Sequence, residues 1–278
     1  MFKIIMPVYN AEKYLEKAVD SIINQTLSFK DNVVIHLIDD SSSDGSLELC
    51  NKYKAQYPDN FIVTHFEENQ GVSAVRNYGI KMCKHEKNVI VGFVDSDDYL
   101  PLNAVSILYQ EIFSSGADIV EGGMCRVLDG WGLIKKKRIC EHLEIEQPVL
   151  FRDYFISFFG INKLGVNLCG KLYKKTLFDK AKLKPSGMKM GEDLLVNMYL
   201  FPFVNKYVVT NHCVYYYRYG GLTSQFNSML YSDLKKQYYI KMNMLVEYDY
   251  QKGVRSTKIE MCNVLCSHLI QMYRFNKS

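Results

Sequence analysis

The sequence predicts an α/β fold in which a doubly wound, mostly parallel sheet carries helices on both faces and a helical appendage follows. Short apolar runs alternate with segments of helical period through residues 1–120. These runs are apolar throughout, which is typical of parallel strands that are covered on both faces. Beyond residue 227 only helix-period segments remain, at about 228–250 and 256–273, divided by Lys252-Gly253.

The elements of the first 120 residues follow one another in regular order. The predicted strands are 2–8, 33–38, 61–66 and 89–94, and the predicted helices are 11–25, 46–57, 72–82 and 103–113. From residue 118 the pattern is looser, with strands near 119–127, 133–139 and 214–219 and helices at 149–159 and from Gly191. We therefore expect a main domain over residues 1–226 and a helical extension over 227–278.

The composition excludes several classes of protein. The chain has 278 residues and a net charge of +4, too small for the basic surface of a nucleic-acid-binding protein. Its eight cysteines form no CxxC pair and its histidines show no paired spacing, which predicts reduced thiols, a cytoplasmic protein and no zinc site. It opens with a strand-like segment instead of a signal peptide, and no apolar run approaches the roughly 20 residues of a membrane span.

Polar clusters follow three of the predicted strands. Pro7-Val8-Tyr9-Asn10 follows the first, Asp39-Asp40-Ser41-Ser42-Ser43-Asp44-Gly45 the second, and Asp95-Ser96-Asp97-Asp98 the fourth. In open parallel sheets, ligands bind at the carboxyl ends of the strands. We therefore expect these clusters to form one site.

The third cluster is typical of a metal site. Asp95 and Asp97 directly follow a buried strand and place two carboxylates two residues apart. Mg²⁺ and Mn²⁺ prefer such oxygen ligands and bind a diphosphate at the same time. The alternative is that Asp97 and Asp98 only cap a helix that begins near Pro101.

The other clusters suit a nucleotide. A carboxylate at Asp39 or Asp40 can accept a hydrogen bond from the imide N–H of uracil, whereas Asp44 fits a helix cap. Residues 69–79 form a loop that enters a helix, which places Arg76 one turn inside for a phosphate or base contact. The alternative for Arg76 is a surface arginine in a salt bridge.

These motifs, in this order, resemble those of glycosyltransferase family 2, whose members have the GT-A fold. With Gly191-Glu192-Asp193 the resemblance covers about residues 1–219. It implies a nucleotide-binding half at 1–120 and an acceptor-side half at 121–226. The implied activity is the inverting transfer of a hexose or N-acetylhexosamine from a UDP-sugar to a saccharide or lipid-linked saccharide hydroxyl, in bacterial surface polysaccharide synthesis.

The resemblance also assigns roles to residues. Asp97, with Asp95, would hold Mn²⁺ or Mg²⁺. Asp193 would be the general base, with Glu192 as the second candidate; without the resemblance, both are simply the acidic first turn of a helix. For Arg218 the alternative is an exposed arginine on a core aromatic strand. The nucleotide-sugar site would comprise Pro7, Val8, Tyr9, Asn10, Asp39, Asp40, Arg76, Asp95, Ser96, Asp97 and Arg218.

Two alternatives stay open at this stage. The chain can be a catalytically inactive nucleotide-sugar-binding module of a polysaccharide assembly complex, although intact Asp97 and Asp193 argue against it. The basic and apolar residues of the last fifty positions suit peripheral contact with an anionic membrane that carries the acceptor. The alternative for these helices is an amphipathic cover or a dimer interface.

Overall fold

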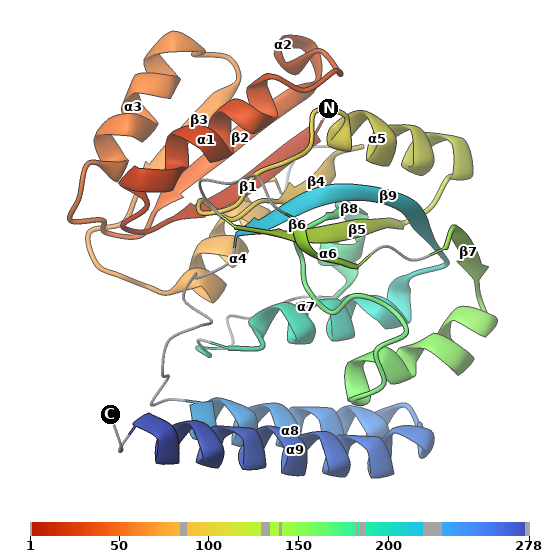
Figure 1. The fold of residues 1–278 in the computed structure, drawn as a ribbon. Coiled ribbons are helices and arrows are strands. Elements are labelled where there is room, and N and C mark those ends of the chain that lie inside the picture. Colours follow the sequence, from red (N-terminus) through yellow and green to blue (C-terminus); the bar gives the residue numbers. More distant parts are fainter. Residues whose placement is uncertain are drawn as a thin grey trace.

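The computed structural model describes residues 2–83, 88–128, 134–138, 141–181, 183, 187–188, 190–218 and 230–275. Its sheet has the strand order β3-β2-β1-β4-β8-β5-β9-β7, with β6 beside β5 (Figure 1). The nucleotide half supplies parallel strands: β1 (Phe2–Val8), β2 (Val33–Asp39), β3 (Phe61–His65) and β4 (Ile90–Phe93). The expected α/β class is confirmed.

The second half of the chain makes the sheet mixed. β8 (Lys171–Lys174) lies antiparallel between β4 and β5 (Ile119–Val127). β9 (Lys206–Arg218) runs parallel to β5, while β6 (Ile134–Arg138) and β7 (Leu143–Glu146) are antiparallel to their neighbours. The predicted strand at 214–219 is therefore the end of a longer strand, and residue 219 lies outside the described residues.

Helices cover both faces of the sheet (Figure 1). On one face lie α1 (Glu12–Ile23), α3 (Ser46–Gln56) and α5 (Ala104–Ser115), and on the other α4 (Val72–Met82), α6 (Thr176–Ala181) and α7 (Glu192–Leu200). The short helices α2 (Phe29–Asn32) and η3 (Phe201–Phe203) complete this domain. The apolar face predicted for the first helix is confirmed, because Leu15, Ala18, Val19 and Ile22 are buried.

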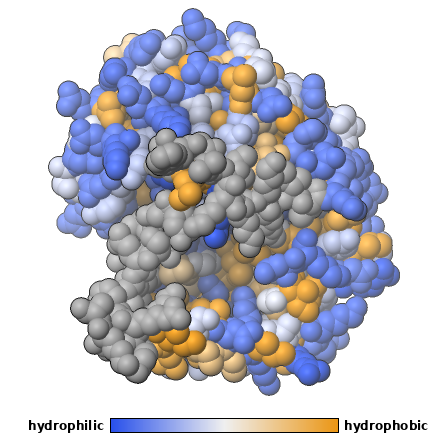
Figure 2. Space-filling view, viewed as in Figure 1, coloured by the Kyte–Doolittle hydropathy of each residue, from blue (hydrophilic) through white to orange (hydrophobic). Residues whose placement is uncertain are grey.

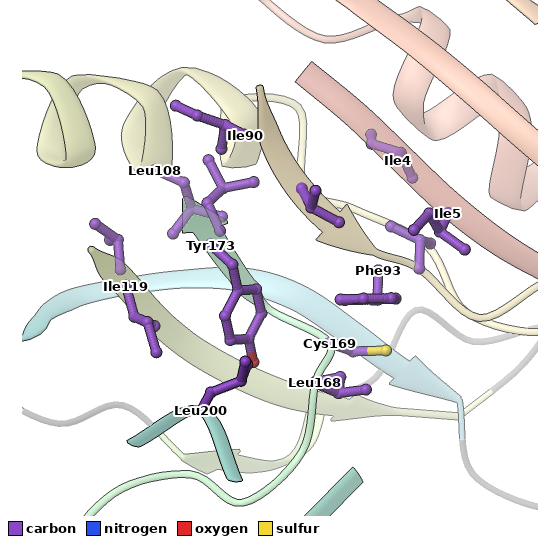
Figure 3. Close-up of a cluster of buried hydrophobic side chains, with 14 of the residues drawn as sticks. Ile4, Ile5, Ile90, Phe93, Leu108, Ile119, Leu168, Cys169, Tyr173 and Leu200 are labelled. Atoms are coloured by element: carbon purple, nitrogen blue, oxygen red, sulfur yellow. The ribbon is translucent and has the colours of Figure 1, made fainter. Parts of the chain in front are cut away.

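The core continues from the sheet into the helices of the second half. Figure 3 shows the Tyr173 ring of β8 between Ile119 of β5 and Leu200 at the end of α7. The Tyr173 hydroxyl is buried and donates to Asn197 Oδ1 in α7 at 2.9 Å, which satisfies its polar end. This packing fixes α7 beneath the sheet.

The helix predicted at 149–159 is irregular in the structure. It divides into a π-helical turn, η1 (Leu150–Tyr154), and a 3₁₀ segment, η2 (Phe155–Phe159). Phe155 packs against both Phe201 and Tyr250, at ring-centroid distances of 5.7 and 5.3 Å. Periodicity does not reveal such a change in winding, because side-chain packing selects it.

The two C-terminal helices, α8 (Leu230–Glu247) and α9 (Lys252–Phe275), form the predicted helical appendage, a hairpin that lies beyond α7 (Figure 1). Gly253 permits its attachment, because a Cβ there would lie 3.1 Å from Phe159 Cγ in η2. None of the described helices is both long and apolar enough to cross a bilayer. The expected division at residue 226 falls outside the described residues and stays a prediction.

Two of the cysteines come together on neighbouring strands: Cys125 in β5 and Cys213 in β9 have Cα atoms 6.4 Å apart. The expectation of reduced thiols stays a prediction. Cys140 lies outside the described residues. The free cysteines among the described residues are Cys50, Cys83, Cys169, Cys262 and Cys266.

Candidate active site

The first two polar loops hold each other in place at the carboxyl ends of β1 and β2. Asp44 accepts the Glu12 N–H at the start of α1 at 3.1 Å, and Glu12 Oε2 accepts the Gly45 N–H before α3 at 3.0 Å. Asn10 Oδ1 accepts the Ser43 N–H at 2.8 Å. Asp44 thus binds the first N–H groups of α1 and α3, although the N-caps of these helices are Ala11 and Gly45. Asn10 shapes the loop through its side chain.

Asp39 is completely buried beneath these loops. Its Oδ2 lies 2.8 Å from Nδ1 of His65 and accepts the Ser42 N–H at 3.2 Å. Its Oδ1 has no hydrogen-bond partner among the described residues, which is costly for a buried polar atom. Val8, the last residue of β1, pairs with Asp39. Tyr9, which follows Val8, is 50% exposed. A ligand with an N–H donor would satisfy this oxygen.

Asp40 binds the loop that leads into α4. Its Oδ1 accepts the Gln70 N–H at 2.7 Å and its Oδ2 accepts the Gly71 N–H at 2.9 Å. Gly71 has a φ of +83°, which a side chain would strain. Because both carboxylate oxygens are engaged, Asp40 acts by orienting α4 and hence Arg76.

Arg76 lies at the centre of the site. Its side chain is buried, Nη2 donates to Asp95 Oδ1 at 2.7 Å, and Nη1 donates to Glu192 Oε1 at 2.9 Å. Nη1 also contacts Asp193 Oδ1. Burial alone would lower the pKa of the guanidinium, but the charges of Asp193 and Asp95 raise it well above its usual value. The surface-arginine alternative is therefore wrong.

Glu192 and Asp193 form the first turn of α7. The pKa of Glu192 is raised to about 7, mainly by burial and secondly by the negative charge of Asp193. Burial also raises the pKa of Asp193, against the opposing effect of Arg76. Asp193 Oδ2 accepts the Leu168 N–H at 3.1 Å, which fixes the carboxylate. A buried carboxylate with a raised pKa is suited to accept a proton near neutral pH.

A buried ion pair, which the sequence analysis missed, supports the loop that contains Leu168. Glu121 accepts the Gly165 N–H at 2.9 Å and the Tyr207 hydroxyl at 2.6 Å. Lys171 Nζ lies 3.8 Å from Glu121 Oε2 and donates to Asn167 O at 2.7 Å. The sequence offered two signals of this ion pair. Glu121 is the one acidic residue in the apolar run 119–127, and Lys171 stands directly before Leu172-Tyr173.

The Asp95-Ser96-Asp97-Asp98 turn is fixed to the end of β9. The Asp95 N–H donates to the Tyr215 hydroxyl oxygen at 3.1 Å, and Asp98 Oδ1 accepts the Arg218 N–H at 2.7 Å. Ser96 is buried within the turn. Helix α5 begins only at Ala104. The alternative that Asp97 and Asp98 cap this helix is wrong.

Arg218 is buried, so the alternative of an exposed arginine is also wrong. Its guanidinium lies 4.6 Å from the ring centre of Tyr14 and 5.6 Å from that of Tyr99. Its Nε donates to the carbonyl oxygen of Asp97 at 2.5 Å. These contacts position the Asp97 turn; the loop that follows, 219–229, lies outside the described residues.

The described residues include no group of three or more His, Cys, Asp or Glu side chains arranged to hold a metal alone. Burial and then the charge of Asp95 raise the pKa of Asp97, and the charge of Arg218 opposes this rise only in part. Asp95 already has Arg76 as its partner and accepts a hydrogen bond from Cys169 Sγ at 3.5 Å. The arrangement fits a cation held by Asp97 together with substrate oxygens.

Comparison with known proteins agrees with this geometry. The family model for glycosyl transferase family 2 matches residues 3–181. Glycosyltransferase GlyA of Streptococcus pneumoniae is 31% identical over 77% of this chain and 30% of its own length. The poly(ribitol-phosphate) beta-glucosyltransferase of Bacillus spizizenii is 32% identical over 77% of this chain and 31% of its own.

The chain thus spans 24% to 31% of the length of the first curated relatives it matches. The crystal structure of S. aureus TarS 1-349 in complex with UDP-GlcNAc superposes with a TM-score of 0.71 at 25% identity, and covers 88% of this chain and 66% of that one. The family match extends over more than half of the chain, from β1 through the Asp95-Ser96-Asp97-Asp98 turn to the end of α6. The chain belongs to glycosyltransferase family 2.

Proposed function

We propose that the protein is an inverting glycosyltransferase that moves a hexose or N-acetylhexosamine from a UDP-sugar to a saccharide or lipid-linked saccharide hydroxyl. The observation that carries this proposal is the Arg76 bridge, which brings Asp95 at the end of β4 beside Asp193 in α7. Relatives named for glucosyl and N-acetylglucosaminyl transfer to poly(ribitol phosphate) support a role in bacterial surface polysaccharide synthesis. We place this reaction in the cytoplasm as part of the proposal.

The residues divide the reaction between them. Asp193 accepts the proton of the acceptor hydroxyl as its oxygen forms a bond to the anomeric carbon, and Glu192 is the second candidate for this role. The bond from that carbon to the UDP oxygen breaks on the opposite face, so the configuration inverts and UDP leaves. Asp97, with Asp95 nearby, would hold Mn²⁺ or Mg²⁺, which offsets the charge that grows on the diphosphate.

The unpaired Oδ1 of Asp39 supports uracil as the base, since the imide N–H of uracil would satisfy this buried acceptor. Tyr9 is exposed beside it for a ring contact. We assign Pro7, Val8 and Asn10 to the walls of the same pocket. Asp40 and Arg218 contribute by orienting α4 and the Asp97 turn, and we retain a phosphate contact as the proposed further role of Arg218.

The first test is the thermal stability of the protein with UDP, GDP, CMP or dTDP, each in Mn²⁺ and in EDTA. A ligand that binds only the folded state stabilises it by mass action and so raises the midpoint of thermal unfolding. At a free ligand concentration a hundred times Kd, the free energy of unfolding rises by about 2.7 kcal/mol. We expect the largest shift with UDP and Mn²⁺, and its loss in EDTA or in Asp97→Ala. The exposed Asp59→Ala serves as the matched control.

The outcomes separate the proposals. A UDP shift that persists in EDTA and in Asp97→Ala contradicts the metal assignment. Equal shifts with all four nucleotides contradict the uridine site. A UDP shift without turnover of any UDP-sugar, across a panel of saccharide and lipid-linked acceptors, favours the inactive binding module.

We also propose that the α8–α9 hairpin makes peripheral contact with an anionic membrane. Each helix exposes one stripe of apolar residues, and Figure 2 shows orange patches among blue ones over this part of the surface. The exposed large apolar side chains are Tyr231, Tyr239, Val246, Ile259, Leu269 and Ile270. The exposed basic side chains are Lys235, Lys236, Lys252, Arg255 and Lys258. This combination suits the surface of anionic lipid.

Sedimentation with lipid vesicles tests this contact. We expect binding to phosphatidylglycerol vesicles, little binding to phosphatidylcholine vesicles, and clearly weaker binding by the double variant Tyr239→Asp, Ile259→Asp. Phe113→Asp on α5 replaces an equally exposed side chain elsewhere and should bind as the unmodified protein does. Equal binding by the double variant, or its conversion of an oligomer into a monomer, would contradict the membrane role.

A further inference from the structure

The C-terminal hairpin contacts the chain directly before the proposed base. Both peptide groups of Met190 are bound by α8: its N–H donates to Asp233 Oδ2 at 3.2 Å, and its carbonyl accepts a long hydrogen bond from Gln237 Nε2 at 3.5 Å. Asp233 and Gln237 are four residues apart, which places them on one side of the helix. One face of α8 therefore holds the residue from which Gly191-Glu192-Asp193 continues.

Gly191 brings the two segments into this contact. It is the N-cap of α7 and has a φ of +84°, in the region that favours glycine. A Cβ at this position would lie 1.5 Å from Gln237 Nε2, so a side chain here would displace the Gln237 amide from the Met190 carbonyl. The turn is thus held on one side by α8 and continues on the other into the carboxylates that meet Arg76.

The hairpin is itself firmly attached. Asp233 is 2% exposed, and Lys241 in α8 is buried and pairs with Glu260 of α9 at 2.5 Å. Gly253 packs on Phe159 at the far end of the hairpin. The hairpin therefore presents a fixed surface to Met190, and a small rotation of α8 would move the first turn of α7.

We propose that Asp233 and Gln237 are positioning residues for the base. Together they fix Met190-Gly191 so that Asp193 faces the acceptor side of the donor site. This rests on the proposed function in one respect, the role of Asp193. It makes the helical extension part of the catalytic machinery, and it links the face that we assign to the membrane with the carboxylate that deprotonates the acceptor.

The test compares variants at one position. Asp233→Asn keeps an oxygen that accepts the Met190 N–H, whereas Asp233→Ala removes it. Hydrogen–deuterium exchange of the peptide covering residues 190–195 should become faster in Asp233→Ala and stay unchanged in Asp233→Asn. UDP release from UDP-GlcNAc, with water as the acceptor, should fall about 10- to 100-fold in Asp233→Ala, because small displacements of a catalytic group have effects of this size.

Two controls make the result specific. The exposed Asn243→Ala on the same helix should change neither quantity, and the thermal shift with UDP should be the same in all variants, since the donor site is untouched. Gln237→Glu, which replaces a donor with an acceptor opposite the Met190 carbonyl, should speed exchange as Asp233→Ala does. It decides the question if Asp233→Ala does not fold.

The failures are distinguishable. Unchanged exchange over residues 190–195 in folded Asp233→Ala and Gln237→Glu overturns the inference. Faster exchange with an unchanged rate of UDP release overturns the positioning role. If the unmodified protein releases no UDP from any UDP-sugar, the proposed function fails, while the exchange measurement still decides whether α8 holds the turn.

Discussion

Replacing Arg76 with alanine is expected to abolish UDP-sugar turnover and to lower the free energy of unfolding by about 3–5 kcal/mol. The guanidinium is buried and meets three carboxylates, on Asp95, Glu192 and Asp193. Without it, three acidic groups lie together at low solvent exposure and lose the counter-charge that they share. They must take up protons or move apart, and either change spoils the base.

Two further variants make this prediction specific. Arg76→Lys keeps the charge but cannot reach several carboxylates with a planar fork, so we expect intermediate stability and low activity. Arg152→Ala removes an arginine whose ion pair with Asp153 is at the surface, and should change neither property measurably. Urea denaturation and UDP release from UDP-GlcNAc are the measurements. An Arg76→Ala protein as stable and active as Arg152→Ala would show that the bridge is unimportant.

The same bridge shows what the sequence could not predict. Motif order was enough to select Asp95, Arg76 and Asp193 as candidate site residues, and the structure places them in contact. Their contact joins α4 to a helix that begins more than a hundred residues later, and no local pattern records such a pairing. The sequence could suggest a phosphate or a surface ion pair for Arg76; only the fold shows that the residue links the two halves of the site.

The fold was predictable where the pattern is local. The parallel strands and their helices in the first half are long apolar or amphipathic segments, and they lie where the period placed them. β8 was missed because it has four residues with a lysine at each end, and its stability comes from β4 and β5 on either side. Residues 149–159 were predicted as an α-helix, but they form a π-helical and a 3₁₀ segment. Aromatic packing determines this change, and the spacing of apolar residues in the sequence does not record it.

The structure also separates two kinds of residue within the motifs. Asn10 and Asp40 use their side chains on backbone N–H groups of neighbouring loops. Asp39 and Asp98 also bind a backbone N–H, but each keeps one buried oxygen without a hydrogen bond among the described residues, and burial beside Asp95 raises the pKa of Asp97. Unsatisfied groups of this kind are where a ligand is expected, and the motif alone does not distinguish them from the loop-forming residues.

Replacing Asp193 with asparagine should reduce turnover about 10²- to 10⁴-fold, the usual contribution of a positioned general base. The asparagine side chain has nearly the same shape and still offers an oxygen to the Leu168 N–H, so the fold and the UDP-induced thermal shift should be kept. Glu192→Gln is the matched control on the neighbouring residue. If Glu192→Gln loses more activity than Asp193→Asn, the two roles are reversed and Glu192 is the base.

The pH dependence gives an independent reading of the same pair. Burial raises the pKa of both carboxyl groups, that of Glu192 to about 7. A base acts only when it is deprotonated, so the rate should rise with pH through the neutral range as the pair loses its protons. In Asp193→Asn this rise should disappear from the residual rate, because the group that must ionise is gone. If the rate still rises with pH in Asp193→Asn but not in Glu192→Gln, Glu192 is the group that titrates and accepts the proton. Either assignment is possible because Arg76 contacts both carboxylates and holds them close together.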